Sequence, residues 1–278
     1  MSYDNAREMS YYFGYDTFTT VQPVFHTVLF SSFIQFGLWI GSENTGLFLF
    51  VIFQAAVMAA ILAYTLLQMK KWNVSRWLRV LTLGIYTTVP YYAGYVSFPI
   101  KDYLYTAFFV LLLLLSFKWN ELNRKEQISW VLSGTLLILF RNNGKIIYLS
   151  IFIVMLIRLI KVKSKGKYAI WTLILPLIFF ALITMGITSA FHVEKDTSKE
   201  MLSLPFQQTA RYVRDYGDEV TEEEKAAIGQ VLDYAKIAKG YMELTSDPVK
   251  TTYHAKEWQV MRLGHPSSIS CFSICLER

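Results

Sequence analysis

The chain has 278 residues, of which 54% are hydrophobic and only 17% charged, and its mean hydropathy is +0.33. A soluble domain carries about 25% charged residues, so this composition argues against a soluble globular protein. The net charge is +6, but the basic residues collect in short loops between apolar stretches, a pattern typical of positive-inside membrane topology and not of a nucleic-acid-binding groove. We therefore predict an all-α, polytopic transmembrane helix bundle without a nucleic-acid partner.

Apolar segments follow one another from residue 23 to residue 191. We expect about six or seven membrane segments, because several of these stretches approach the roughly 20 residues that a helix needs to cross a hydrocarbon core. Residues 1–22 are read as an external N-terminal segment, 23–192 as the transmembrane bundle and 193–278 as an external helical tail that is truncated. The apolar segments are Pro23–Ile40, Gly46–Gln68, Leu78–Phe98, Tyr103–Trp119, Ile128–Phe140, Lys145–Ile160 and Tyr168–Phe191.

Charge sets the orientation of these segments. Two basic loops, at residues 70–79 and 158–167, belong on the cytoplasmic side. The segment that ends at Phe98 then runs outward and delivers Lys101 and Asp102 to the external face. Segment Pro23–Ile40 breaks the alternation, so we read it as a re-entrant or interfacial helix. In the alternative it spans the membrane, and the basic residues near position 70 are then misplaced.

The C-terminal region has the signals of short soluble helices. One helix is expected from Leu204 to Tyr216. A second is expected from Thr221 to Gly240, because Thr221 and Glu224 have capping-box spacing. "SDPVK" at residues 246–250 is a turn signature. Cys271 and Cys275 have no other metal-ligand residues around them, so neither a zinc site nor a disulfide framework is predicted.

Asp4, Lys101 and Asp102 all fall at the predicted external face, where ionisable groups beside a helix bundle indicate a functional site. Asp4 is either a solvated residue or a general base that takes a proton from an acceptor hydroxyl. Lys101 and Asp102 are either an interfacial anchor followed by a helix N-cap, or a clamp in which Lys101 holds a donor phosphate and Asp102 fixes its position.

Two further stretches carry candidate binding residues. "RNNG" at residues 141–144 suits a tight turn, but Arg141, followed by Asn142, offers a guanidinium fork that matches phosphate oxygens. On the tail helix, Gln207 and Arg211 share a face and Gln208 lies beside them. These three form either an ordinary solvated face or a surface that recognises sugar or phosphate. His26 is read as a helix-start or packing residue and not as a catalyst.

The order of several short pieces resembles a family of bacterial multipass proteins grouped with the C-type (GT-C) membrane glycosyltransferases, distant relatives of the protein O-mannosyltransferases. The pieces are "SYDN" at 2–5, "QPVFHTVL" at 22–29, "PIKDYLYTAF" at 99–108, "LFRNNG" at 139–144, "LSLPFQQTAR" at 202–211 and "SDPVK" at 246–250.

The resemblance implies an inverting transferase of the bacterial plasma membrane that takes a sugar from a polyprenyl-phosphate donor at the outer face. The lipid-linked sugar is the substrate, and no cofactor is implied. Asp4 matches the acidic residue of the family's first external loop, and Lys101 and Arg141 correspond to its phosphate-binding basic residues.

Two departures from the family pattern indicate a fragment. The first transmembrane helix, expected before "SYDN", is absent, and the tail becomes rich in Ser and Cys after residue 262. Two other functions remain open. A transporter or lipid flippase would carry ionisable groups near the bilayer midplane, and a non-catalytic membrane protein would use its external tail to bind a partner.

Overall fold

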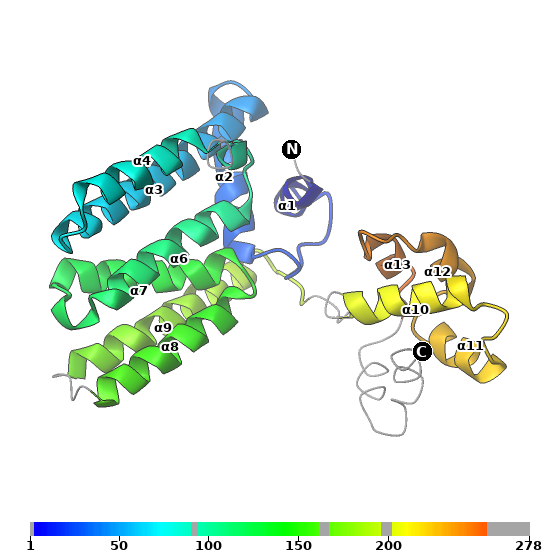
Figure 1. Ribbon diagram of the computed structural model, residues 1–278. Helices are drawn as coiled ribbons and strands as arrows, with labels where there is room; N and C mark the ends of the chain where they lie inside the picture. Colours follow the sequence, from blue (N-terminus) through cyan, green and yellow to red (C-terminus); the bar gives the residue numbers. More distant parts are fainter. Residues whose placement is uncertain (1–2, 90–93, 162–166, 196–201, 255–278) are drawn as a thin grey trace. The chain divides into compact units, whose positions relative to one another are not determined.

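The computed structural model describes residues 3–89, 94–161, 167–195 and 202–254 (Figure 1). These residues are all-helical, with isolated β-bridges and no strand among them, which confirms the all-α part of the predicted fold class. The chain divides into two compact units, residues 1–195 and 196–278, and each unit is described by itself.

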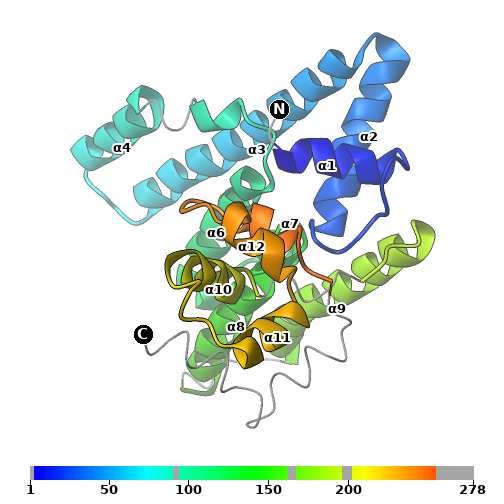
Figure 2. The same cartoon turned by 90° about the vertical axis from the view of Figure 1, so that its right-hand side faces the viewer.

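The first unit is a bundle of apolar helices with a short N-terminal helix. In Figure 1, α6, α7, α8 and α9 run side by side, and α2 lies across the end of this bundle where α6 begins; Figure 2 turns that end toward the viewer. The helices are α1 (Tyr3–Tyr12), α2 (Val24–Ile40), α3 (Glu43–Lys71), α4 (Arg76–Thr88), α6 (Lys101–Phe117), η1 (Trp119–Glu121), α7 (Arg124–Phe140), α8 (Gly144–Lys161) and α9 (Lys167–Ala190).

Two glycines let the backbones of α2 and α3 touch. A Cβ on Gly37 would lie 2.1 Å from the backbone nitrogen of Gly46, and a Cβ on Gly46 would lie 2.4 Å from the carbonyl oxygen of Phe33. Ser42 caps α3 by accepting a hydrogen bond from the Thr45 amide. This hairpin packs α2 against α3 near the end of α2, the helix whose start carries part of the candidate site.

Helices α6 and α7 are joined through a polar turn. Asn123 and Glu126 form a capping box at the start of α7, and Lys118 donates a hydrogen bond to Glu126 at 2.7 Å. Burial disfavours the charged form of Glu126, but the hydrogen bonds from Lys118 and the Asn123 backbone outweigh it and hold the pKa of this carboxyl below its usual value. The cap extends α7 back to Arg124, four residues earlier than the predicted Ile128.

The core of the bundle lies between α6, α7, α8 and α9. Trp130, Leu137 and Tyr148 are fully buried there, and the Tyr148 hydroxyl donates a hydrogen bond to the Leu173 carbonyl at 2.7 Å. A Cβ on Gly134 would lie 2.7 Å from the Tyr148 ring, so α7 approaches α8 closely at this point. The ends of α6, α7 and α8 are therefore held in fixed relative positions.

Two described helical stretches are long and apolar enough to cross a membrane, Glu43–Lys71 and Ile170–Ala190. Helices α2, α6 and α7 have 17 residues each, which gives a rise of about 26 Å at 1.5 Å per residue. Helix α8 has 18 residues, among them Lys145, Arg158 and Lys161. The described residues thus contain fewer clear spans than the six or seven predicted, and the multipass topology stays a prediction.

One predicted feature of the first unit is corrected. Segment Leu78–Phe98 is not one helix, because α4 ends at Thr88. Val89 has an extended backbone (φ −75°, ψ 116°), as expected for the residue before Pro90. The N-terminal segment, which has no apolar stretch, nevertheless contains helix α1.

The second unit is a small helical cluster built around Phe206, Val213, Leu232 and Ile237. Its helices are α10 (Ser203–Asp215), α11 (Glu222–Gly229), α12 (Tyr234–Gly240) and α13 (Asp247–Lys250). The capping box of Thr221 and Glu224 is confirmed.

The predicted helix from Thr221 to Gly240 is split in the structure. Helix α11 ends at Gly229, and the connection turns Val231 and Leu232 into the core before Asp233 caps α12. "SDPVK" forms the one-turn helix α13 where a turn was predicted. Cys271 and Cys275 lie outside the described residues.

Candidate functional site

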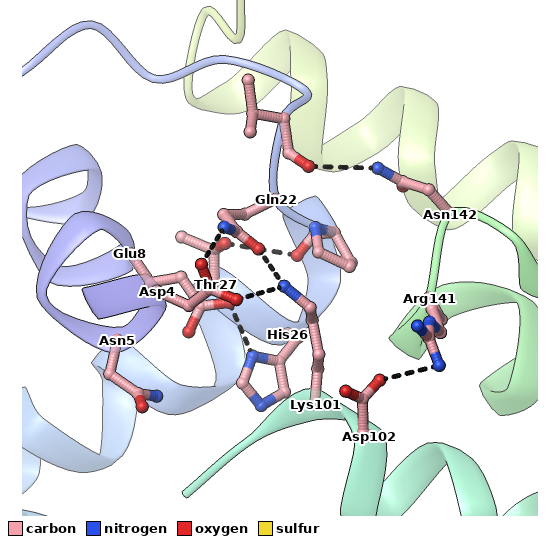
Figure 3. Close-up of polar contacts among 12 residues, drawn as sticks. Asp4, Asn5, Glu8, Gln22, His26, Thr27, Lys101, Asp102, Arg141 and Asn142 are labelled. Atoms are coloured by element: carbon pink, nitrogen blue, oxygen red, sulfur yellow. Dashed lines mark hydrogen bonds and ion pairs between the residues drawn. The ribbon is translucent and has the colours of Figure 1, made fainter. Parts of the chain in front are cut away.

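The candidate site is built where α1 packs against the start of α2. Asp4 and Glu8 are one helical turn apart on α1, so they share a face. Gln22 and His26 have the same four-residue spacing at the start of α2. The two pairs meet as two layers, Asp4 with Gln22 and Glu8 with His26 (Figure 3).

The first layer is closed by Lys101 from the first turn of α6. The Lys101 Nζ atom donates hydrogen bonds to Asp4 Oδ2 at 2.9 Å and to Gln22 Oε1. The Gln22 amide in turn donates to Asp4 Oδ1 at 3.0 Å. Both carboxylate oxygens of Asp4 therefore accept a hydrogen bond, although its side chain is 49% exposed.

The second layer is buried. His26 Nδ1 lies 2.8 Å from Glu8 Oε1, and each side chain is only 1% exposed. Three phenylalanine rings surround the imidazole, Phe30, Phe50 and Phe140. Glu8 Oε2 and His26 Nε2 have no hydrogen-bond partner among the residues that the structure describes. The contact ties α1 to α2 and so fixes the helix that presents Asp4.

Asp102 faces away from this network and toward the end of α7. Arg141 Nη1 lies 3.1 Å from Asp102 Oδ1 without hydrogen-bond geometry, and both side chains are half-buried. The Arg141 guanidinium also lies over the Tyr105 ring, 5.6 Å from its centroid. Two readings of Asp102 are thereby corrected: Ile100 is the N-cap residue of α6, and Lys101 does not pair with Asp102.

Two amides join the surrounding segments. The Asn142 side chain donates to the carbonyl oxygens of Thr20 and Val21, at 3.2 Å each, and the buried Asn5 side chain donates to the Pro99 carbonyl at 2.6 Å. The sharp turn at "RNNG" needs no left-handed residue, because positive φ occurs among the described residues only at Gly14, Asn73 and His192.

Gln207, Gln208 and Arg211 belong to the second unit. The Gln207 amide donates to the carbonyls of Met242 and Glu243, at 2.8 and 3.1 Å. Arg211 is exposed and lies 3.6 Å from Asp215, and Gln208 is half-buried on the same helix. The recognition of sugar or phosphate by these three residues stays a prediction.

The structure brings together five of the predicted site residues at one end of the first unit: Asp4, Lys101, Asp102, Arg141 and Asn142. Sequence reasoning missed Asn5, Glu8 and Gln22, and it read His26 as a helix-start or packing residue alone. The four-residue spacings of Asp4 with Glu8 and of Gln22 with His26 would have identified them, but only with a helix predicted at residues 3–12.

The arrangement offers the half-exposed carboxylate of Asp4 and two cations, Lys101 and Arg141, at one end of the first unit. No cluster of three or more His, Cys, Asp or Glu side chains suited to a metal ion occurs within the described ranges. The Lys101 ammonium and the Arg141 guanidinium suit phosphate oxygens, and Asp4 suits a hydroxyl that must lose a proton.

The fold and the site define an all-helical protein with two apolar helices of membrane-spanning length and a charged cluster at one end of its helix bundle. Residues 15–265 match a protein family described as a family of unknown function (DUF6020), and the chain belongs to this family. Neither the curated proteins nor the solved structures contain a match to the chain.

Proposed function

We propose that this protein is a membrane glycosyltransferase of the GT-C type, which transfers a sugar from a polyprenyl-phosphate donor to an acceptor hydroxyl at the outer membrane face. The observation that carries the proposal is the contact of Lys101 with Asp4, next to the pair of Asp102 and Arg141. These contacts involve a carboxylate and two cations, of the kind that bind phosphate, at one end of an apolar helix bundle.

The proposal requires the first unit to lie in a membrane. Large apolar side chains cover the outward faces of its helices: Val154 on α8 is 62% exposed, and Met185 on α9 is 64% exposed. Helix α2 lies across the end of the bundle (Figure 1), an orientation that suits an interfacial helix. The basic loops then face the cytoplasm, and the Asp4 cluster, which consists of Asp4, Gln22, Lys101, Asp102 and Arg141, faces outward.

In the proposed reaction, Asp4 takes the proton of the acceptor hydroxyl as its oxygen attacks the anomeric carbon of the donor sugar. The bond from that carbon to the phosphate oxygen breaks, and polyprenyl phosphate leaves with the electron pair. Lys101 and Arg141 stabilise the negative charge on the phosphate that leaves, which is the electrostatic contribution expected of cations placed where charge develops.

The contacts observed without substrate suit a resting state of this reaction. Asp4 accepts a hydrogen bond on each oxygen, so a base at this position needs one of them released. An incoming donor phosphate attracts the Lys101 ammonium, and this movement frees Asp4 Oδ2 for the acceptor hydroxyl.

A structural role for the same residues is the second candidate. Lys101 already pairs with Asp4 and Arg141 with Asp102, and these contacts alone would hold α1, α6 and α7 together. The two candidate functions make different predictions for Asp4. In the catalytic one its carboxylate is needed for sugar transfer, and in the structural one it is needed only to hold the helices together.

The proposed function is tested by incubating the purified chain in lipid vesicles with radiolabelled polyprenyl-phosphate sugars and measuring the release of polyprenyl phosphate. Asp4→Asn keeps the size of the side chain but removes the base, so we expect at least about a 100-fold loss of rate, the usual contribution of general acid–base catalysis. Asp16→Asn is the matched control, because Asp16 is exposed and its side chain accepts a hydrogen bond from the neighbouring Thr17 amide.

Thermal unfolding of both variants separates the two candidates. If Asp4→Asn unfolds like the wild-type protein but has lost transfer, the catalytic role stands. Transfer that persists in Asp4→Asn, or that the wild-type chain lacks with every donor sugar, contradicts the proposed function.

A further inference from the structure

A groove runs between α6 and α8, far from the Asp4 cluster. Its volume is about 350 Å³, within the range of about 300–1,000 Å³ that small-molecule sites occupy. Apolar side chains form most of its lining, and its polar members are Ser116, Ser150 and Arg158. Ser116 lies 15 residues beyond Lys101 on α6, about 22 Å along the helix axis, so the groove is at the opposite end of the bundle.

Arg158 is the charged residue of the groove. Its Nη1 atom donates a hydrogen bond to the Ser116 carbonyl at 2.9 Å, which holds the half-buried guanidinium at the groove. No carboxylate among the described residues forms an ion pair with Arg158. An arginine with N–H donors to spare beside apolar side chains matches a molecule with an anionic head and a hydrocarbon chain.

The surroundings of the groove indicate where such a molecule comes from. Trp72 is 44% exposed, and its ring centroid lies 6.4 Å from that of Phe117, which lines the groove. Tryptophan favours the membrane–water interface. Lys161, in the same last turn of α8, is exposed, so the positive charge at this end is not limited to Arg158.

We propose that the groove between α6 and α8 binds an anionic phospholipid, with one acyl chain along Leu113, Ile151 and Val154 and the phosphate at Arg158. Basic pockets between membrane helices on the cytoplasmic side recognise acidic lipid head groups, and the positive-inside orientation puts this groove on that side. The lipid fills an apolar surface and neutralises the guanidinium. The inference depends on a membrane location but not on sugar transfer.

The test is a titration of the purified full-length chain in detergent with phosphatidylglycerol and with phosphatidylcholine of identical acyl chains, followed by native mass spectrometry. We expect the first phosphatidylglycerol to bind at least about fivefold more tightly, the factor for about 1 kcal/mol per arginine at a membrane surface. Arg158→Gln should reduce this ratio to about one, while Lys161→Gln, in the same helical turn but outside the groove lining, should keep it.

A second pair of variants tests the acyl-chain part of the groove. Val154→Trp fills the groove from an exposed position and should weaken the binding of both lipids, whereas Ile153→Trp, which is 54% exposed and outside the lining, should not.

Three outcomes of these titrations would contradict the proposal. The two lipids bind the wild-type chain equally, Lys161→Gln loses the preference as Arg158→Gln does, or Val154→Trp and Ile153→Trp bind lipid alike. Displacement of the lipid by millimolar inorganic phosphate alone would also contradict the proposal, because the groove would then bind anions without recognising an acyl chain.

Discussion

Glu8 and His26 form a buried contact in which each residue keeps one polar atom that has no partner in the described part of the chain. Such a pair contributes little net stability compared with apolar residues of similar size, but the loss of one partner is costly because the other is left buried and unsatisfied. The main effect of the contact is therefore to fix the position of α1 on α2.

We predict that His26→Phe lowers the free energy of unfolding by about 3 kcal/mol, since Glu8 then has no partner in its buried site. The double variant Glu8→Leu/His26→Phe should recover most of this loss, because two apolar side chains replace both polar groups. Thermal unfolding of the purified variants measures both effects. A His26→Phe variant as stable as the wild-type chain would show that the contact contributes nothing.

At the scale of residues, the sequence predicted most charged members of the candidate site but not which of them contact each other. Lys101, Asp102 and Arg141 were found because charges beside long apolar runs are rare. The adjacency of Lys101 and Asp102 suggested that they act together. On a helix, consecutive side chains point about 100° apart, and this divergence sends Lys101 to Asp4 and Asp102 to Arg141.

At the scale of helices, the ends of α2, α6, α8 and α9 fall within two residues of the predicted apolar segments, because an uninterrupted apolar run leaves little freedom in where a helix lies. Helix α1 could not be predicted in this way. Its ten residues are largely polar, and an isolated helix of this length is marginal, so it depends on packing against α2.

The close contact between α2 and α3 predicts that a larger residue at Gly46 destabilises the protein. Gly46→Ala should lower the free energy of unfolding by about 1–3 kcal/mol, because the new Cβ would lie 2.4 Å from the Phe33 carbonyl oxygen and the helices must move apart. Gly84→Ala in α4 is the control: a Cβ there meets nothing within 4 Å, and alanine favours a helix.

Chemical denaturation in detergent compares the two glycine variants. We expect Gly84→Ala to be at least as stable as the wild-type chain. Equal stability of Gly46→Ala and Gly84→Ala would mean that the contact between α2 and α3 is looser than the structure has it.

At the scale of the molecule, charge separates the two ends of the first unit. In Figure 1, α3, α6 and α8 end, and α4 and α7 begin, at the end of the unit opposite to α2, and a basic set lies at these helix ends. The basic set consists of Lys70, Lys71, Arg76, Arg79, Lys118, Arg124, Lys125, Arg158 and Lys161. This asymmetry was predictable from the sequence because basic residues and apolar runs alternate along the chain.

The asymmetry predicts which end faces the cytoplasm. In a background with Cys271→Ser and Cys275→Ser, a membrane-impermeant maleimide added to intact cells should label Asn143→Cys and leave Lys125→Cys unlabelled until the cells are opened. Both positions are exposed, so access depends on the side of the membrane. The reverse labelling pattern would overturn the orientation on which the proposed function depends.

Because Lys101 and Asp102 point in different directions, their contacts depend on the rotation of α6 about its own axis. One residue added to or removed from the connection that precedes Lys101 would turn the helix by about 100° and misdirect both side chains at once. The contacts to α1 and to the end of α7 are therefore satisfied together in a single register of this helix. The length of the connection at residues 97–100 should accordingly tolerate change far less than its sequence does.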